Sequence, residues 1–184
     1  MPKECDAAPT TELRDACIAA AREAIALNGI ECLSLRDVAR RLGVSHQAPY
    51  KHYPSRDHLL AEVMRRCFQQ FAQDLDGRKH FDDPHQDLES LSRQYLSYAE
   101  QHPLEYRLMF GTPWPAAAEH SDLLRDSTHA FDILRQVLRR IHGSSAKQCE
   151  RADLDAMFVW STMHGLAGVM NGECIGKLGL QQKM

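Results

Sequence analysis

The sequence predicts an all-α fold, and three observations support this expectation. Apolar residues recur at steps of three and four along most of the 184 residues, which is the spacing of one face of an α-helix. Residues that cap and end helices flank these segments. No alternating apolar and polar run is long enough to predict a strand. The polar segment DGRKHFDDPH predicts a boundary near residue 80, between domains of residues 1–80 and 81–184.

The N-terminal domain is expected to begin with two helices. The apolar spacing indicates a first helix from Thr11 to Asn28, which stops at Gly29. In SLRDVARRL, Ser34 can cap a short second helix, and Asp37 three residues later comes close to a capping box.

A turn and a third helix follow directly. Gly43 can take the left-handed conformation that ends a helix, and Ser45 can cap the next helix at once. Two helices joined by a three-residue turn have the geometry of a helix-turn-helix, here over about residues 34–53. The third helix, from Ser45 to about His52, must be short or distorted because Pro49 stands at about its fourth position.

Helical patterns continue to the end of the chain. A fourth helix follows Ser55 and carries an apolar stripe from Leu60 to Leu75. The later segments are a fifth helix marked by Leu88 to Ala99, a short sixth in PLEYRLMF, a loop in GTPWPAAAE, and two long helices at Ser121 to His142 and Ala152 to about Gly176.

The last two helices carry apolar residues on more than one face. In the final helix, Leu154, Met157 and Phe158 share a stripe with small residues such as Gly165, while Trp160 lies across from it. A helix that is apolar nearly all round is buried on both sides. We therefore expect one side to face the core and the other to face a second subunit, in a two-fold symmetric homodimer.

Charge is distributed unevenly along the chain. The net charge is −3, yet residues 34–66 hold seven basic and three acidic residues, a net +4, so the rest carries −7. A basic segment on an acidic protein indicates a local polyanion site. An architectural protein that coats DNA would be basic throughout, so this gradient disfavours that class.

The sequence also indicates where the protein is located and whether it holds disulfides, metal or a cofactor. The N-terminus MPKECDAAPTTEL lacks the pattern of a signal peptide, and the apolar stretches are too short to span a bilayer. Six scattered cysteines without a CxxC pair disfavour disulfides and zinc. We expect a soluble cytoplasmic protein with reduced thiols, no cofactor and no membrane partner.

The segment SLRDVARRLGVSHQAPYKHYPSRDHLL resembles the helix-turn-helix of the TetR family of bacterial transcriptional regulators. In that family a Gly-Val-Ser turn precedes a tyrosine, a His-aromatic pair and a Ser-Lys-acid cap. The resemblance spans Leu33 to Leu75. It departs from the family at Arg56, where lysine is usual, and at Tyr50 and Lys51 after Pro49, which leaves the base preference open.

The C-terminal half also resembles this family. The stretches HPLEYRLMF and VWSTMHGLAGV are similar to a subgroup labelled by a Trp-His-Gly pattern, here Trp160, His164 and Gly165. The resemblance implies an N-terminal three-helix DNA-binding domain and a helical C-terminal domain for effector binding and dimerisation.

A ring of hydrogen-bond donors in the predicted helix-turn-helix suits a phosphate backbone, since hydroxyl, ammonium, guanidinium and imidazole groups all donate to phosphate oxygens. Gln47 can bind adenine in bidentate fashion and Ala48 can touch a thymine methyl group. We interpret Tyr53 as a core residue. The expected DNA-contacting residues are Ser34, Arg36, Ser45, His46, Gln47, Ala48, Tyr50, Lys51, His52 and Arg56.

A small-molecule effector pocket is expected between helices of the C-terminal domain, lined by apolar side chains with few polar anchors. His164 could anchor a ligand or bond a backbone carbonyl inside the core. Each candidate could also be an ordinary core residue. The candidates are Tyr95, Tyr98, Phe110, Trp114, Phe131, Met157, Trp160, Met163 and His164.

The leading hypothesis is a repressor that binds a double-stranded palindromic operator as a homodimer and is released by an effector. Activation is the less common outcome. An enzyme is disfavoured because the chain has no GxSxG elbow, glycine-rich phosphate loop or HExxH motif. Metal sensing by the scattered histidines and redox sensing at Cys67 are minor alternatives.

Overall fold

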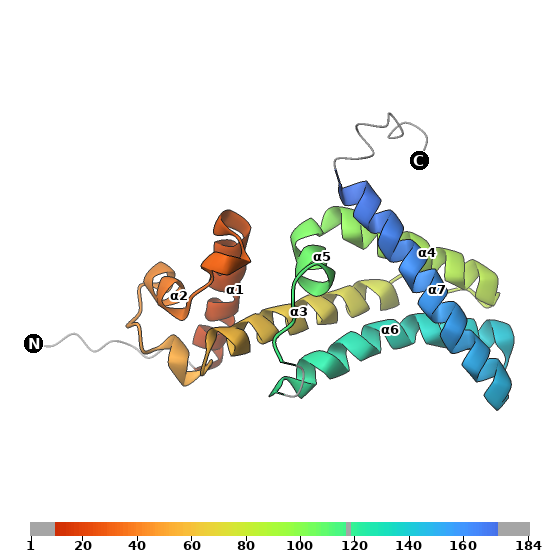
Figure 1. The fold of residues 1–184 in the computed structure, drawn as a ribbon, viewed down its shortest axis with the longest axis horizontal. Helices are drawn as coiled ribbons and strands as arrows, with labels where there is room; N and C mark the ends of the chain where they lie inside the picture. Colours follow the sequence, from red (N-terminus) through yellow and green to blue (C-terminus); the bar gives the residue numbers. More distant parts are fainter. Residues whose placement is uncertain (1–9, 117–118, 173–184) are drawn as a thin grey trace, which may run out of the picture. The chain divides into compact units, whose positions relative to one another are not determined.

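The computed structural model describes residues 10–116 and 119–172, and over these residues the chain is entirely helices, turns and loops (Figure 1). The all-helical prediction is therefore confirmed. The elements are α1 (Thr10–Asn28), η1 (Ile30–Cys32), α2 (Leu35–Leu42), η2 (Pro49–Lys51), α3 (Arg56–Asp76), α4 (Pro84–Gln101), α5 (Pro103–Phe110), α6 (Ser121–His142) and α7 (Ala146–Asn171), where η marks a 3₁₀ turn.

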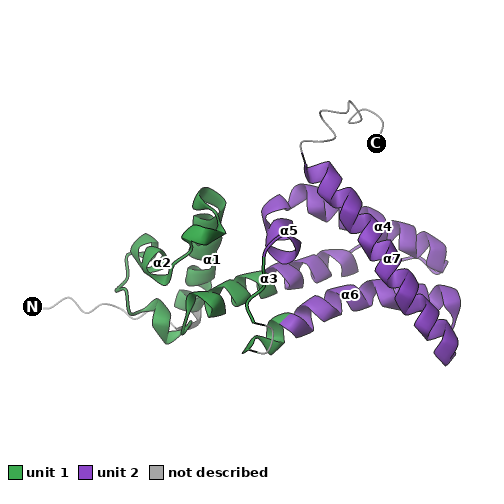
Figure 2. Cartoon of the chain, in the orientation of Figure 1, with its two compact units in different colours: residues 1–66, 113–123 green, residues 67–112, 124–184 purple. Residues whose placement is uncertain are grey.

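The chain divides into two compact units (Figure 2). Unit 1 comprises Met1–Arg66 and Pro113–Leu123, and unit 2 comprises Cys67–Thr112 and Leu124–Met184. Helices α3 and α6 each contribute residues to both units. The division by compactness thus falls within α3, and the expected domain boundary near residue 80 stays a prediction.

Unit 1 is built on the capping signals that the sequence carries. The Ser34 side chain accepts a hydrogen bond from the Asp37 backbone N–H at 3.2 Å, which caps α2. Gly43 ends α2 with φ at +67°, a left-handed conformation that costs glycine little. The second helix and its turn are therefore confirmed. The core of this unit includes the fully buried Cys17, Val38 and Leu59.

The predicted third helix is shorter than expected. Residues 46–48 form a turn, and only Pro49–Lys51 form a single 3₁₀ turn. Three hydrogen bonds run from an N–H to the carbonyl three residues earlier, from Ala48 to Ser45, from Lys51 to Ala48 and from His52 to Pro49. Pro49 has no N–H with which to make the α-helical bond to Ser45, so the segment tightens instead.

Unit 2 packs α4 against α7 and α5. Its core includes Tyr98, Leu108 and Met109, each at most 1% exposed. Helix α7 begins six residues before the predicted start, because Ser145 and Gln148 form a reciprocal capping box that the sequence reading missed. The predicted continuation of this helix to Gly176 lies outside the described residues.

A buried ion network ties the α3–α4 turn to α6 within unit 2. Arg78 donates to Asp87 at 3.2 Å, and their side chains are 3% and 1% exposed. Arg140 of α6 approaches the same carboxylate at 2.5 Å and donates to the carbonyls of Phe81 and Asp82. Asp87 thus lies between two guanidinium groups.

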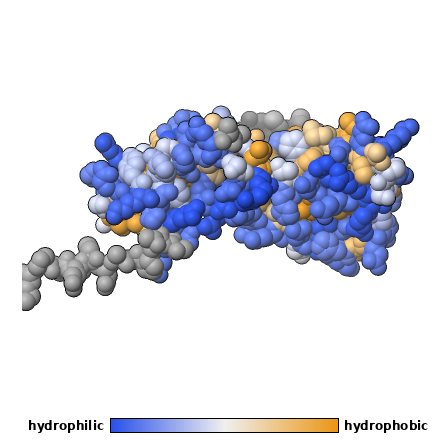
Figure 3. All heavy atoms as spheres, turned by 90° about the horizontal axis from the view of Figure 1, so that it is seen from below, coloured by the Kyte–Doolittle hydropathy of each residue, from blue (hydrophilic) through white to orange (hydrophobic). Residues whose placement is uncertain are grey.

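None of the described helices is long and apolar enough to cross a membrane. One face of the molecule, drawn in Figure 3, carries mainly hydrophilic residues, with apolar ones in small patches.

Candidate DNA-contacting surface

The segment of residues 45–52 presents a row of polar side chains to solvent. Ser45, His46, Gln47, Tyr50 and Lys51 are all exposed. On the opposite side of the same segment Pro49 is buried, and Ala48 and His52 are half-buried. The segment therefore has an inner side that packs and an outer side rich in donors, as base and phosphate contacts require.

Tyr53 fixes this segment to α1. Its side chain is 3% exposed, and its hydroxyl donates to the Arg14 carbonyl at 3.2 Å. Burial raises the pKa of Tyr53 to about 12, which keeps the hydroxyl protonated as a donor. The interpretation of Tyr53 as a core residue is confirmed.

Helix α2 adds a second row of charge. Arg36 is exposed and makes no ion pair among the described residues. Arg40 and Arg41 both bind Asp37, and the hydrogen bond from Arg41 is the larger cause of the lowered pKa of that carboxyl. Ser34 uses an oxygen lone pair for its capping bond and retains its hydroxyl hydrogen. Arg36 is thus the cation of α2 that is free to meet a phosphate.

Arg56 is already engaged in the fold. Its guanidinium donates to the Leu33 carbonyl at 3.1 Å and to the Ile30 carbonyl at 2.8 Å, so it joins the start of α3 to the residues before α2. A lysine could not make both bonds in this planar fork geometry. The remaining nitrogen of Arg56, Nη1, donates to Asp57 at 3.3 Å. The side chain is 37% exposed, and its predicted phosphate contact would share Nη1 with this carboxylate.

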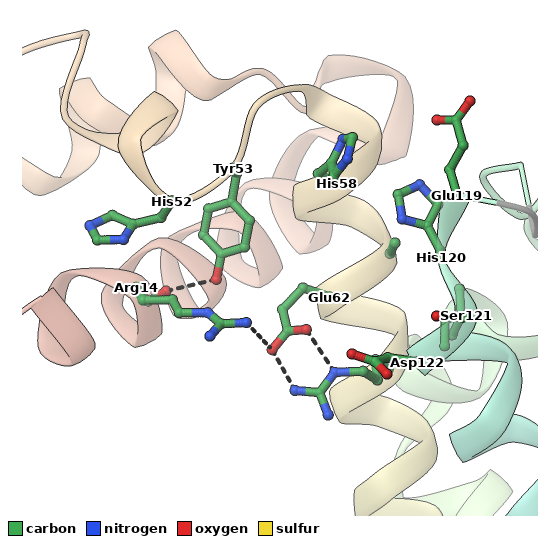
Figure 4. Close-up of a pocket in the computed structure, with 12 residues that line it drawn as sticks. Arg14, His52, Tyr53, His58, Glu62, Glu119, His120, Ser121 and Asp122 are labelled. Atoms are coloured by element: carbon green, nitrogen blue, oxygen red, sulfur yellow. Dashed lines mark hydrogen bonds and ion pairs between the residues drawn. The ribbon is translucent and has the colours of Figure 1, made fainter.

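A polar pocket of about 190 Å³ lies behind the His52 end of the segment, within unit 1 (Figure 4). Glu62 accepts two hydrogen bonds from Arg65, at 2.6 and 2.7 Å. The rings of His58 and His120 meet edge to face, with centroids 4.9 Å apart. The residues that line it are Arg14, His52, Tyr53, His58, Ala61, Glu62, Arg65, Glu119, His120, Ser121, Asp122 and Leu123.

The sequence reading missed this pocket. His58 and His120 are sixty-two positions apart, and no spacing signal links them. The pocket walls carry both signs of charge, so they favour no simple anion or cation. Within residues 10–116 and 119–172, no group of three or more His, Cys, Asp or Glu side chains could hold a metal ion.

In unit 2 the structure brings six of the nine candidate effector residues into one aromatic cluster. Trp160 and His164 stack with centroids 5.3 Å apart and planes at 17°. Phe110 and Phe131 each lie 6.2 Å from the Trp160 ring. Further ring contacts through residues that were not among the candidates complete the cluster. It comprises Phe68, Phe71, Tyr95, Tyr98, His102, Tyr106, Phe110, Phe131, Trp160 and His164.

The other three candidates are placed differently. Trp114 belongs to unit 1 and is 37% exposed, and Met157 is 52% exposed on α7. Met163 is buried, at 6% exposed. Met157 lies on an exposed face of α7, and Trp114 is counted with unit 1 rather than with the unit that holds the cluster.

A chain of hydrogen bonds runs through this cluster. The hydroxyls of Tyr95 and Tyr106 are 2.9 Å apart, and the Tyr106 hydroxyl lies 2.7 Å from Nδ1 of His164. Burial is the main cause of the raised pKa values of both tyrosines and of the lowered pKa of His164. The three groups are therefore neutral near pH 7. We call Tyr95, Tyr106 and His164 the relay.

Helix α7 also exposes an apolar stripe. Leu154, Phe158 and Val169 are 66%, 74% and 46% exposed. A Cβ at Gly165 would meet nothing within 4 Å in this chain, so the stripe has room for a close partner. The sequence predicted that one of the two apolar faces of this helix would meet a second subunit without saying which, and the stripe of Leu154, Phe158 and Val169 is the face that the structure leaves exposed.

Two family models match the chain. Residues 18–63 match the one described as "Bacterial regulatory proteins, tetR family", and residues 88–174 match "Tetracyclin repressor-like, C-terminal domain". The first match covers the surface around residues 45–52, and the second covers most of the aromatic cluster.

Curated relatives match over part of their length. The HTH-type transcriptional regulator Rv1816 of Mycobacterium tuberculosis (strain ATCC 25618 / H37Rv) is 30% identical over 91 residues, which are 48% of this chain and 39% of the relative. The same figures hold for the HTH-type transcriptional regulator Mb1846 of Mycobacterium bovis. The match thus spans about two fifths of the length of these relatives.

Solved structures share the fold over nearly the whole chain. The crystal structure of SCO4313 has a TM-score of 0.77 at 23% identity, covering 97% of this chain and 92% of the other. A protein of unknown function from Rhodococcus sp. RHA1 has a TM-score of 0.73 at 24% identity, covering 95% and 89%. The two family models together match residues 18–63 and 88–174, so the chain belongs to the TetR family of bacterial regulatory proteins.

Proposed function

We propose that this protein is a DNA-binding transcriptional regulator. It binds a palindromic operator as a homodimer, acts as a repressor in the cytoplasm, and is released by a small-molecule effector. The observation that carries the proposal is the segment of residues 45–52, whose donors face solvent while Tyr53 and Pro49 hold its inner side. The DNA-binding domain would comprise residues 1–80 and the effector and dimerisation domain residues 81–184.

Sequence-specific contact would come from the start of the exposed segment. Gln47 would read adenine through its amide, and Ala48 a thymine methyl group. His46 would also face the base edges. Ser45, Tyr50 and Lys51 would hold the phosphates, helped by Ser34, Arg36, His52 and Arg56. Phosphate contacts fix register, and only the base contacts select sequence.

Dimerisation would use the apolar stripe of α7. Three large side chains, Leu154, Met157 and Phe158, are more than half exposed there, which is costly for an isolated helix. A two-fold axis through the stripe would place the stripe of one copy against the same stripe of the second copy. The dimer would then present two DNA-binding segments to two half-sites.

The effector would bind at the aromatic cluster of unit 2 and shift the population away from the DNA-bound form. Trp160, His164 and Gly165 keep the spacing of the Trp-His-Gly subgroup, so we assign the C-terminal domain to that subgroup as part of this proposal. Helix α3 continues from unit 1 into unit 2, which provides a covalent link between the two functions.

The proposal is tested by binding of the purified full chain to fluorescent DNA from upstream of its own gene, against scrambled duplex, over a salt series. We expect affinity at least ~10³-fold tighter for a palindromic segment, with a steep salt dependence. The salt dependence is the slope of the logarithm of the binding constant against the logarithm of the salt concentration. Lys51→Ala should reduce the magnitude of this slope by about one for each copy of the chain. Gln47→Ala should lower the preference for the palindromic sequence and leave the slope unchanged.

Equal weak binding to both duplexes would exclude autoregulation at that locus and direct the search to other operators. Absence of DNA binding even at low salt would refute the proposal.

A further inference from the structure

We infer that the aromatic cluster of unit 2 takes a neutral, flat carbonyl compound, whose oxygen accepts a hydrogen bond from Nε2–H of His164. The inference rests on the proposed effector function and adds the chemical class of the effector. It depends on which groups donate in the two hydrogen bonds of the relay, on which nitrogen of His164 carries the proton, and on the charge of the side chains around that ring.

The direction of the relay follows from counting buried hydrogens. Tyr95 is 3% exposed, and Tyr106 is its one hydrogen-bond partner among the described residues. If Tyr95 accepted from Tyr106, its own hydroxyl hydrogen would be buried without an acceptor, which costs about 1–3 kcal/mol. Tyr95 therefore donates to Tyr106, and Tyr106 donates to Nδ1 of His164.

This direction fixes the imidazole tautomer. Nδ1 can accept from Tyr106 only when it carries no hydrogen, so the neutral ring must carry its proton on Nε2. Tyr106 is the one hydrogen-bond partner of His164 in the described part of the chain. The ring is half-buried, so its Nε2–H remains as a donor for a ligand.

The surroundings favour a flat ligand without charge. Trp160, Phe110 and Phe131 are half-buried rings around His164, and offset or edge-to-face contact suits a further aromatic or conjugated group. No arginine or lysine makes a hydrogen bond or a cation–π contact with Trp160 or with a member of the relay among the described residues. A carboxylate would lose its hydration here without gaining a cation, whereas a carbonyl oxygen needs a single donor.

The test measures ligand affinity and the tautomer on the full chain. Ligand-observed NMR gives the Kd of acetophenone, of α-methylstyrene, in which CH₂ replaces the carbonyl oxygen, and of benzoate, which adds a negative charge. Long-range ¹H–¹⁵N spectra of the histidine side chains report which ring nitrogen of His164 carries the proton. His164→Phe keeps an aromatic ring without the donor, and His129→Phe, at an exposed position of α6, is the matched control.

We expect the proton on Nε2 and about fivefold to tenfold tighter binding of acetophenone than of α-methylstyrene, as one neutral hydrogen bond provides. Benzoate should bind more weakly than acetophenone. The preference for the ketone should vanish in His164→Phe and persist in His129→Phe.

Equal affinities for the two neutral probes, no binding of acetophenone, tighter binding of benzoate, a proton on Nδ1, or a preference that survives in His164→Phe would each overturn the inference. DNA binding of the same preparations separates it from the proposed function. Operator binding without a ketone preference would refute only the ligand class, and a ketone preference without any DNA binding would support the ligand chemistry and refute the regulator.

Discussion

The two units bury tyrosine hydroxyls in different ways. In unit 1, Tyr53 donates to a main-chain carbonyl, that of Arg14, and so holds a segment whose functional side chains point outward. In unit 2, Tyr95, Tyr106 and His164 bind one another, side chain to side chain, from α4, α5 and α7. Every amino acid has a main-chain carbonyl, so any residue at position 14 could accept the hydrogen bond from Tyr53. The relay, by contrast, needs three particular side chains. The exposed surface of unit 1 can therefore vary without loss of the fold, whereas the ligand recognition that we propose for unit 2 would depend on side chains of its core.

The largest expected effect is at the buried ion network of unit 2. Asp87→Ala removes the carboxylate that faces Arg78 and Arg140 and leaves the buried Arg78 without its counter-charge. Breaking such a pair costs about 3–5 kcal/mol of unfolding free energy. Urea denaturation followed by circular dichroism measures the loss.

Glu89→Ala on the same helix is the control, because Glu89 and Arg93 form a pair whose side chains are 63% and 79% exposed. That change should alter stability by at most about 1 kcal/mol. Similar losses for Asp87→Ala and Glu89→Ala would show that the buried network does not hold unit 2 together.

A smaller effect is expected from removing one hydroxyl of the relay. Tyr106→Phe leaves the buried Tyr95 hydroxyl without an acceptor and His164 Nδ1 without a donor, at a cost of about 1–3 kcal/mol. The same substitution at the exposed Tyr50 of unit 1 should change stability by less than about 0.5 kcal/mol while weakening DNA binding. Equal destabilisation by the two changes would remove the contrast between the units.

Local signals made unit 1 largely predictable from sequence. The cap at Ser34, the left-handed Gly43 and the short segment around Pro49 each depend on residues within four positions of one another. The aromatic cluster was predictable only in part. Trp160 and His164 lie four apart on one helix and do stack, but Tyr106 is fifty-eight residues from His164, and no periodicity links them. Met157 lies outside the cluster and is 52% exposed, a placement that the sequence did not predict because α7 has two apolar faces and the sequence alone does not say which one faces the core.

Ser34→Ala tests how far the fold of unit 1 depends on its capping bond. It removes the acceptor for the Asp37 N–H and should cost about 1 kcal/mol, since the first turn of α2 then has an unsatisfied donor. Ser45→Ala is the matched change, because the Ser45 hydroxyl makes no hydrogen bond among the described residues. It should leave stability unchanged and reduce affinity for DNA. A lower melting temperature for Ser45→Ala than for Ser34→Ala would contradict this assignment.

The smallest effect is expected from pH, and it separates the two units by the pH range in which their perturbed groups titrate. Burial lowers the pKa of His164 below its ordinary value, so the folded chain holds the ring neutral while the unfolded chain takes up a proton near pH 6.5. The stability linked to this neutral ring is complete above that pH and is lost as the pH falls toward the lower pKa of the folded state. A melting series between pH 8 and 5 should therefore show a steeper decline for the natural chain than for His164→Phe, which has no group to protonate there. The carboxyls with lowered pKa values, such as Asp37, act only below this range, so a parallel decline in the two proteins would mean that His164 does not stay neutral in the folded state.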